Sequence, residues 1–384
     1  MSGENLTKLD TIFLTLKENQ GFDVLLDEKL VAILKNRDII ESRIRKMASS
    51  NLQFERVLGK LVYLIERFHT YRTNSTHMKA RSYLQDVVIE LVSTFPSCPN
   101  PLILLSEENR ILDLPLANKN DYIIEASYLK ANSIAGCAGI NHEIGHCMFK
   151  EYFIQDGKSD QFLEIFNPPL EKQLRKLKLK VPLEYIATWI FNWVSEFVAD
   201  AFSVLTLGMG GFVRFIKDSQ NQGIPMYLGK YTHPPNNLRL QLMKDRLMMY
   251  SDDLDHNDAS FQIVNNWKTQ GRYQMPTSVY LKSALNDPQF DRDAIQSFID
   301  KGETTSIPNK LAFDRKLLKT IYSYIDAVLD WGRIRPNFNS IQSAVEELKK
   351  NNITKAQKNT IFAALIDITK GEYNASLEEL LQSY

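Results

Sequence analysis

The sequence predicts a mostly α-helical protein with a small β-sheet, which places the chain in the α+β class. Apolar residues recur at helical spacing from Phe54 to Phe68 and from Leu84 to Phe95, and again from Leu317 to Leu329. Two short apolar runs between these segments, Leu102–Leu105 and Tyr122–Ala126, are typical of strands. We therefore expect helices toward both ends of the chain and two strands nearer its middle.

The middle of the chain carries three further helical segments. Helical character runs from about Ala131 to Phe153, from Pro182 to about Leu207, and from Leu238 to Tyr250. Pro182 suits the first turn of its helix, where a missing N–H does no harm. The sequence Asn167-Pro168-Pro169 predicts a loop, because proline breaks the hydrogen-bond pattern of a helix interior.

The length of 384 residues fits two domains, or one large domain with extensions. A polar stretch over residues 251–276 predicts a boundary. We expect a helical N-terminal extension over residues 1–80, a central domain over residues 81–250 and a helical C-terminal domain over residues 276–384.

Composition narrows the class of protein. The chain has 46 basic and 46 acidic residues, and this zero net charge argues against a general nucleic-acid-binding protein. Three cysteines are too few, and odd in number, for a disulfide framework. The polar start, Met1–Asp10, lacks the apolar core of a signal peptide. We therefore expect a cytoplasmic protein.

One apolar stretch, Tyr185–Ile216, is long enough to be mistaken for a membrane span. Glu196 and Asp200 lie in its middle, and each acid at a bilayer centre costs about 2.5–3.5 kcal/mol. We expect no membrane span, and instead a buried core helix that carries two functional acids.

A motif with chemical meaning begins at His142. The sequence His142-Glu143-Ile144-Gly145-His146 has the pattern H-E-x-x-H. Residues four apart lie on the same helix face, so the two imidazoles can bind one metal ion. Glu143 is placed to accept a proton from the attacking water as a general base. Imidazole ligands at a hydrolytic site favour Zn²⁺.

A catalytic zinc ion usually has three protein ligands, and Glu196 is the candidate for the third. Two acids four residues apart in an apolar helix are expensive to bury without partners. Glu196 bound to zinc would be compensated, and Asp200 would lie near the ring of a zinc-binding histidine. We expect Asp200 to accept the other N–H of that ring and to fix its tautomer.

A third segment, Tyr231-Thr232-His233-Pro234-Pro235, is followed by Arg239. The prolines hold His233 rigidly, so it could donate a hydrogen bond to the oxyanion of the reaction. The phenol of Tyr231 could serve the same purpose, and the sequence leaves the choice open.

Together these segments resemble the gluzincin metallopeptidases related to the CaaX-prenyl endopeptidases. Members of that group pair an H-E-x-x-H helix with a later E-x-x-x-D helix, then a T-H-P-P-like turn and an arginine. The resemblance covers roughly residues 85 to 250 and implies that the 81–250 domain is a zincin-like metallopeptidase core. It implies that His142, His146 and Glu196 are zinc ligands and that Glu143 is the general base. It further implies that Asp200 supports a ligand and that His233 lies near the site. Arg239 is expected to anchor its loop through an ion pair.

The chain departs from the best-known relatives, which are embedded in membranes. The helical flanks match no family that we can name. A second resemblance is to the soluble ImmA/IrrE-type peptidases that cleave repressors, which share the H-E-x-x-H motif and a later E-x-x-A-D-like segment. The T-H-P-P turn favours the first group.

The sequence therefore predicts a zinc-dependent endopeptidase acting on a protein or peptide substrate. A strand beside the site, Tyr122–Ala126, is expected to hold the substrate backbone by edge pairing. Two alternatives to an active endopeptidase remain open. The chain could be a regulatory protein with a structural zinc site, or a scaffold whose peptidase domain is latent. The sequence does not predict the oligomeric state.

Overall fold

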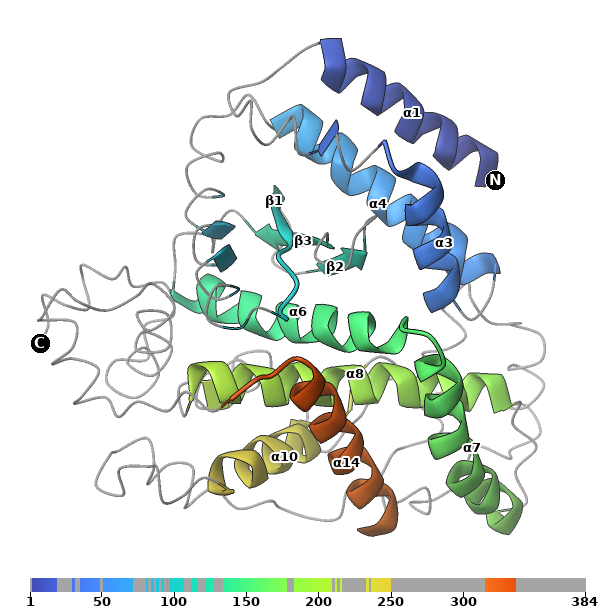
Figure 1. Cartoon of the computed structure of the whole chain (residues 1–384), viewed down its shortest axis with the longest axis vertical. Coiled ribbons are helices and arrows are strands. Elements are labelled where there is room, and N and C mark those ends of the chain that lie inside the picture. The colour runs from blue at the N-terminus through green and yellow to red at the C-terminus, as the bar shows by residue number, and fades with distance from the viewer. Residues whose placement is uncertain are drawn as a thin grey trace, which may run out of the picture.

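The computed structural model shows a mostly helical α+β fold, as the sequence predicts (Figure 1). The structure describes residues 2–18, 35–48, 51–71, 97–106, 112–115, 122–127, 134–177, 183–208, 236–249 and 315–335, together with isolated positions between them. Its helices are α1 (Ser2–Glu18), α3 (Arg37–Met47), α4 (Asn51–Tyr71), α6 (Ile134–Phe153), α7 (Lys158–Leu177), α8 (Leu183–Leu207), α10 (Asn236–Met248) and α14 (Arg315–Trp331). Its strands are β1 (Leu102–Ser106), β2 (Leu112–Pro115) and β3 (Tyr122–Ser127).

The three strands form one sheet in the order β1-β3-β2. Strand β3 is parallel to β1, with Leu102 opposite Ile123, and antiparallel to β2, with Leu114 opposite Ile123. The strand predicted to pair with substrate is therefore the central strand, and both of its edges already bond to neighbours. That expectation is wrong for β3, and the described strand with a free edge next to α6 is β2.

Alternation along the strands divides the apolar residues between two cores, one on each face of the sheet. Leu102, Leu104 and Ile123 belong to the core formed with the N-terminal helices α1, α3 and α4, in which β1 packs against α4. Ile103 and Ile124 face the opposite way, into the core that contains α6 and α8. Figure 1 shows the result, with the sheet lying between the N-terminal helices and α6. The helix that carries the H-E-x-x-H motif thus packs on the sheet.

A buried ion pair ties the N-terminal helices to the end of α6. Arg43 of α3 bonds to Glu151 of α6, and both side chains are buried. The guanidinium also lies 3.4 Å from the hydroxyl of Tyr122 and over its ring. Because removal of one member would leave the other charge buried and alone, this pair fixes how the N-terminal layer meets the site helix.

Helix α7 corrects one prediction, because it continues through the proposed loop at Pro168 and Pro169. Two prolines leave two carbonyl groups of the preceding turn without their usual donors. The helix persists because its inner face is strongly anchored. Phe162 and Phe166, one turn apart, are fully buried with ring centroids 4.6 Å apart.

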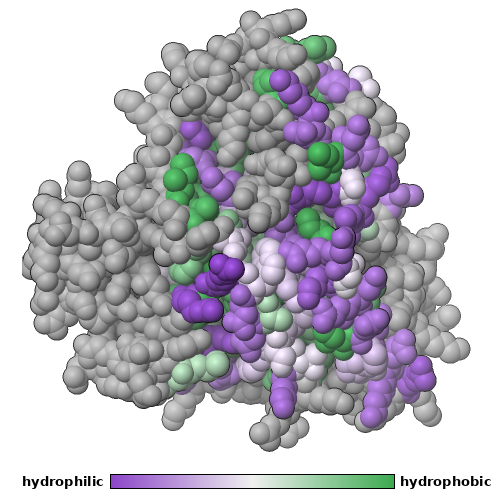
Figure 2. All heavy atoms as spheres, viewed as in Figure 1, coloured by the Kyte–Doolittle hydropathy of each residue, from purple (hydrophilic) through white to green (hydrophobic). Residues whose placement is uncertain are grey.

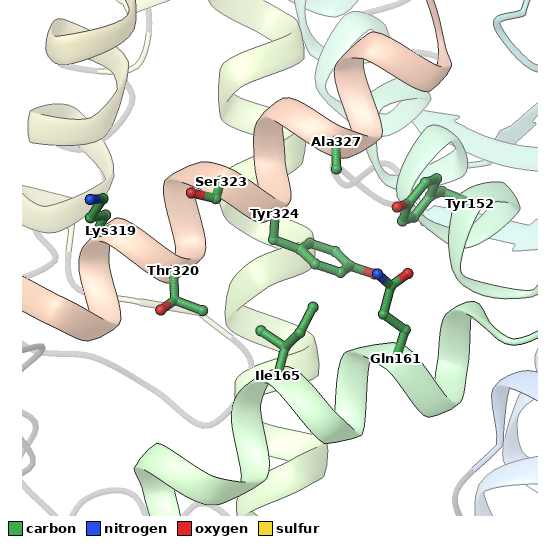
Figure 3. A pocket seen from close by; sticks show the side chains of 8 residues that line it. All are labelled: Tyr152, Gln161, Ile165, Lys319, Thr320, Ser323, Tyr324 and Ala327. Atoms are coloured by element: carbon green, nitrogen blue, oxygen red, sulfur yellow. The ribbon is translucent and has the colours of Figure 1, made fainter.

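Helix α14 packs into the same core as α6 and α8, although it comes from the last quarter of the chain. The ring of Tyr324 contacts those of Phe149, Tyr152, Phe162 and Phe166. Between α14 and α7 lies a cavity of about 480 Å³ (Figure 3). The rest of the predicted 276–384 domain lies outside the described residues, so its extent stays a prediction.

The face drawn in Figure 2 is mainly hydrophilic where residues are described, with separate small hydrophobic areas. Among the described residues, the large apolar side chains left exposed are scattered over α1, α3, α4 and α7, an isolated position before β1, and the residue after α10. They are Leu14, Ile39, Tyr63, Leu163, Ile89 and Met249. The window Ile190–Leu207 of α8 is long and apolar enough to cross a membrane, but 89% of it is buried inside the protein. Core packing accounts for the apolar character of that helix.

Candidate metal centre

Helices α6 and α8 together bring three ligand groups to one point. His142, His146 and Glu196 offer ligand atoms that all lie within 4.8 Å of one another. Nε2 of His142 lies 3.5 Å from Oε2 of Glu196, and Nε2 of His146 lies 3.4 Å from Oε1. This cluster could bind a metal ion.

Two separations within the group can be compared with those around a tetrahedral ion. Ligand atoms held about 2.0–2.2 Å from such an ion lie roughly 3.3–3.6 Å from one another. The nitrogen–oxygen distances of 3.5 Å and 3.4 Å fall in that range but end on different oxygens of Glu196, and the three ligand atoms as a group lie within 4.8 Å of one another. Oε2 of Glu196 is also buried, with Nη2 of Arg239 2.9 Å away. Two imidazoles and a carboxylate therefore suit a divalent cation in chemistry, and they lie close enough together to be candidates for one ion.

The site depends on an unusually close approach of the two helices, which run antiparallel. A Cβ atom at Gly145 would lie 2.6 Å from the Cα atom of Ala199, so only glycine fits at this contact. Further along the contact, the amide of Asn141 donates a hydrogen bond to the hydroxyl of Thr206 at 3.0 Å. The glycine inside the H-E-x-x-H motif thus allows α8 to bring its acid within reach of both histidines.

Each histidine has a second partner on α8. Nδ1 of His142 lies 3.2 Å from Oδ1 of Asp200, the role that the sequence suggested for this acid. Nδ1 of His146 lies 2.8 Å from Oγ of Ser195, a residue that sequence reasoning missed. Its position next to Glu196 was the only signal, because serine is common and carries no charge. Partners of this kind orient the ring and fix which nitrogen faces the metal.

Arg239 of α10 joins the two acids. Its Nε and Nη2 donate to the two carboxylate oxygens of Asp200, each at 2.7 Å. Nη2 also lies near Glu196, and the ring of Phe215 packs 4.4 Å from the guanidinium carbon. The ion pair that was expected to anchor the loop is thus formed with the acids of the site itself.

Charges at the site move the pKa values of its acids and bases strongly. Burial alone would raise the pKa of Glu196, but the charges of His233, Arg239 and His146 hold it well below its usual range. The pKa of Asp200 is also lowered, because Arg239 outweighs the effect of burial. Both acids are therefore ionised at neutral pH.

His142 responds in the opposite direction. Burial alone lowers the pKa of this imidazole, but hydrogen bonds to Asp200 and Glu196 and the charges of both acids raise it to about 9. The two neighbouring acids thus favour a positive charge at His142, which a proton or a metal ion can supply.

Two further predicted residues, His233 and Glu143, lie close to the ligand group. Nε2 of His233 is 3.4 Å from Oε1 of Glu196, and its side chain is 53% exposed. Glu143 is partly exposed on α6, and its charge helps to raise the pKa of Arg239 against the effect of burial. His233 is not part of the three-residue ligand group. Tyr231 and Thr232 lie outside the described residues.

Comparisons of the chain with protein-family models, with curated proteins and with solved structures found no match. The function must therefore be argued from the site itself. That site combines the imidazoles of His142 and His146, the ionised carboxylate of Glu196, the neighbouring acid Glu143 and the exposed His233. Groups of these kinds can support metal-assisted hydrolysis.

Proposed function

We propose that this protein is a zinc-dependent endopeptidase of the gluzincin type, with a zincin-like core built around α6, α8 and the sheet. The observation that carries the proposal is the convergence of His142, His146 and Glu196, with Glu143 one residue along from the first histidine. A structural zinc site would need a fourth protein ligand, and the ligand group among the described residues has three. The adjacent cysteine, Cys147, is fully buried in the hydrophobic core instead.

Zinc held at this site would polarise the scissile carbonyl group and make the attacking water more acidic. The chain's own residues supply the rest of the reaction. Glu143 accepts the proton of the water and passes it to the leaving amine. His233, exposed at the edge of the ligand cluster, donates a hydrogen bond to the carbonyl oxygen as negative charge develops there.

The substrate is a protein or peptide whose backbone pairs with β2. This strand bonds to β3 on one side, lies next to α6, and has no partner on its other side among the described strands. An extended peptide could add there as a further strand, with its carbonyl groups near the motif helix. This replaces β3 as the strand that carries the substrate.

The first test is the metal content of the full chain, measured by elemental mass spectrometry after purification without added metal. We expect about one zinc per chain in the wild type and little in His146→Ala, since one of three ligands is lost. No zinc in a folded wild type, even after incubation with the ion, would remove the basis of the proposal.

The second test separates binding from catalysis. Glu143→Gln keeps the size of the side chain and removes its basicity, so the variant should bind zinc like the wild type and lose peptide cleavage. Cleavage of a responsive substrate at the wild-type rate would show that Glu143 is not the base. Normal zinc content with no cleavage by the wild type of any peptide in a diverse library would favour a regulatory protein instead.

A further inference from the structure

We propose that Ser195 is a positioning residue whose hydroxyl group serves both tautomers of His146, so that this ring keeps its partner when its other nitrogen takes up a metal ion. The inference rests on the proposed metal site, but not on peptide cleavage.

The two nitrogens of His146 face different groups. Nε2 lies 3.4 Å from a carboxylate oxygen of Glu196, and Nδ1 lies 2.8 Å from the hydroxyl oxygen of Ser195. An ionised carboxylate only accepts hydrogen bonds, so without metal the ring proton belongs on Nε2 and the serine hydroxyl donates to Nδ1. The three side chains are buried, so water cannot easily replace the serine.

Metal binding at Nε2 requires the opposite arrangement. The proton of the neutral ring then lies on Nδ1, which donates to the serine oxygen, while the lone pair of Nε2 faces the ion. In the neutral ring the proton thus moves from Nε2 to Nδ1. A hydroxyl group can follow this change, because it can donate or accept after a simple rotation.

His142 is built differently, because its Nδ1 faces Asp200 at 3.2 Å. Arg239 donates a hydrogen bond to each oxygen of this acid, an arrangement typical of an ionised carboxylate. The acid can only accept, so Nδ1 of His142 carries a proton with or without metal. The two histidines of the motif are therefore not equivalent, and His146 is the ring that changes tautomer.

The short serine side chain reaches His146 only because α6 and α8 nearly touch. Gly145 lies directly against the backbone of Ala199, and Ser195 is one turn of α8 away from that contact. The next residue, Glu196, supplies the ligand carboxylate. Close packing thus allows consecutive residues of one helix to serve both nitrogens of a single imidazole.

The direct test is long-range ¹H–¹⁵N NMR of the histidine rings in the full-length wild type, without metal and with one equivalent of zinc. We expect His146 to carry its proton on Nε2 without metal and on Nδ1 with zinc. His142 should keep a proton on Nδ1 in both states. A proton on Nδ1 of His146 in both states would overturn the inference, and this experiment needs no variant.

Three variants test the serine itself, with zinc affinity measured by competition with a chelator. Ser195→Ala should weaken zinc binding about 10- to 100-fold, as loss of a ligand's supporting partner usually does. Ser195→Thr keeps the hydroxyl and should restore most of the affinity. Ser203→Ala removes another buried serine hydroxyl from α8 and should leave the affinity unchanged.

Wild-type zinc affinity in Ser195→Ala would also overturn the inference. A protein that shows the expected tautomers and serine dependence but cleaves no peptide would keep this inference and lose the proposed peptidase activity. The reverse result, peptide cleavage without serine dependence, would keep the activity and reject the role of Ser195.

Discussion

The Cα atom of Ala199 lies so close to Gly145 that a Cβ atom at position 145 would approach it to 2.6 Å. Real Cβ atoms do not come this near to another backbone, so Gly145→Ala must push α6 and α8 apart. We expect the variant to lose about 1–3 kcal/mol of unfolding free energy, as overpacked cores do. It should also bind zinc more weakly, because Glu196 moves away from both histidines. Chemical denaturation and zinc competition measure the two effects.

A matched control is Gly59→Ala in the middle of α4. There the added Cβ would meet only the side-chain amide of Asn5 at 3.8 Å, which is an ordinary contact. Alanine is the better helix former, so this variant should gain about 0.5–1 kcal/mol. If both variants changed stability in the same direction, the close contact of α6 with α8 would not be the cause.

The buried pair of Arg43 and Glu151 makes a second prediction. Arg43→Met or Glu151→Met leaves one buried charge alone and should reduce the free energy of unfolding by about 3–5 kcal/mol. The double variant should recover much of this loss, because no charge is stranded. Arg175→Ala breaks an exposed pair with Glu171 on α7 and should cost less than about 1 kcal/mol. Additive losses in the double variant would mean that the two side chains do not interact.

Tyr324 should tolerate loss of its hydroxyl group. The side chain is 4% exposed, and its oxygen has no hydrogen-bond partner in the described structure, although the ring packs among four other aromatic rings. Tyr324→Phe removes a buried polar atom and keeps the ring. We expect thermal stability to stay the same or rise, since an unsatisfied buried group costs about 1–3 kcal/mol. A clear loss would show that the hydroxyl has a partner in solution.

The stability of the zinc-free protein should depend on pH through His142. Its pKa of about 9 lies above the ordinary value, so the protonated ring stabilises the folded state. This contribution is complete below about pH 6.5, the ordinary pKa of histidine, and is lost as pH rises toward 9. Denaturation of the metal-free protein across this range should show falling stability.

Protein loaded with zinc provides the comparison for that experiment. The ion takes the place of the proton, so the fall between pH 6.5 and 9 should largely vanish. An equal fall with and without zinc would place the titrating group elsewhere in the molecule.

The proximity of the candidate ligand groups could be predicted because the motifs that carry them are local in the sequence. His142 and His146 are four residues apart on one helix, and two acids in an apolar helix demand partners. Ser195 could not be predicted, because only the packing of α8 on α6 selects it from many serines. The double contact of Arg239 was equally hidden, since it joins α10 to Asp200, which is 39 residues away.

The sheet shows the same limit. The apolar runs of β1 and β3 predict strands from the sequence alone. Strand β2 has the sequence Leu-Asp-Leu-Pro, which gives no such pattern, and it forms through its pairing with β3. The continuity of α7 past Pro168 also depends on tertiary packing, because buried phenylalanines hold a helix that its local sequence would break. Local propensity therefore failed where long-range contacts decide the conformation.

The division of the metal site between α6 and α8 has a consequence for the order of events during synthesis. His146 leaves the ribosome 50 residues before Glu196, and Arg239 follows 43 residues later. Protein synthesis adds about 5–20 residues per second, so Glu196 is made roughly 2–10 s after His146. A metal ion that meets the growing chain finds an incomplete set of ligands, so firm loading belongs to the finished fold. If the proposed site binds metal, we therefore expect the ion to enter the folded protein and not the nascent chain.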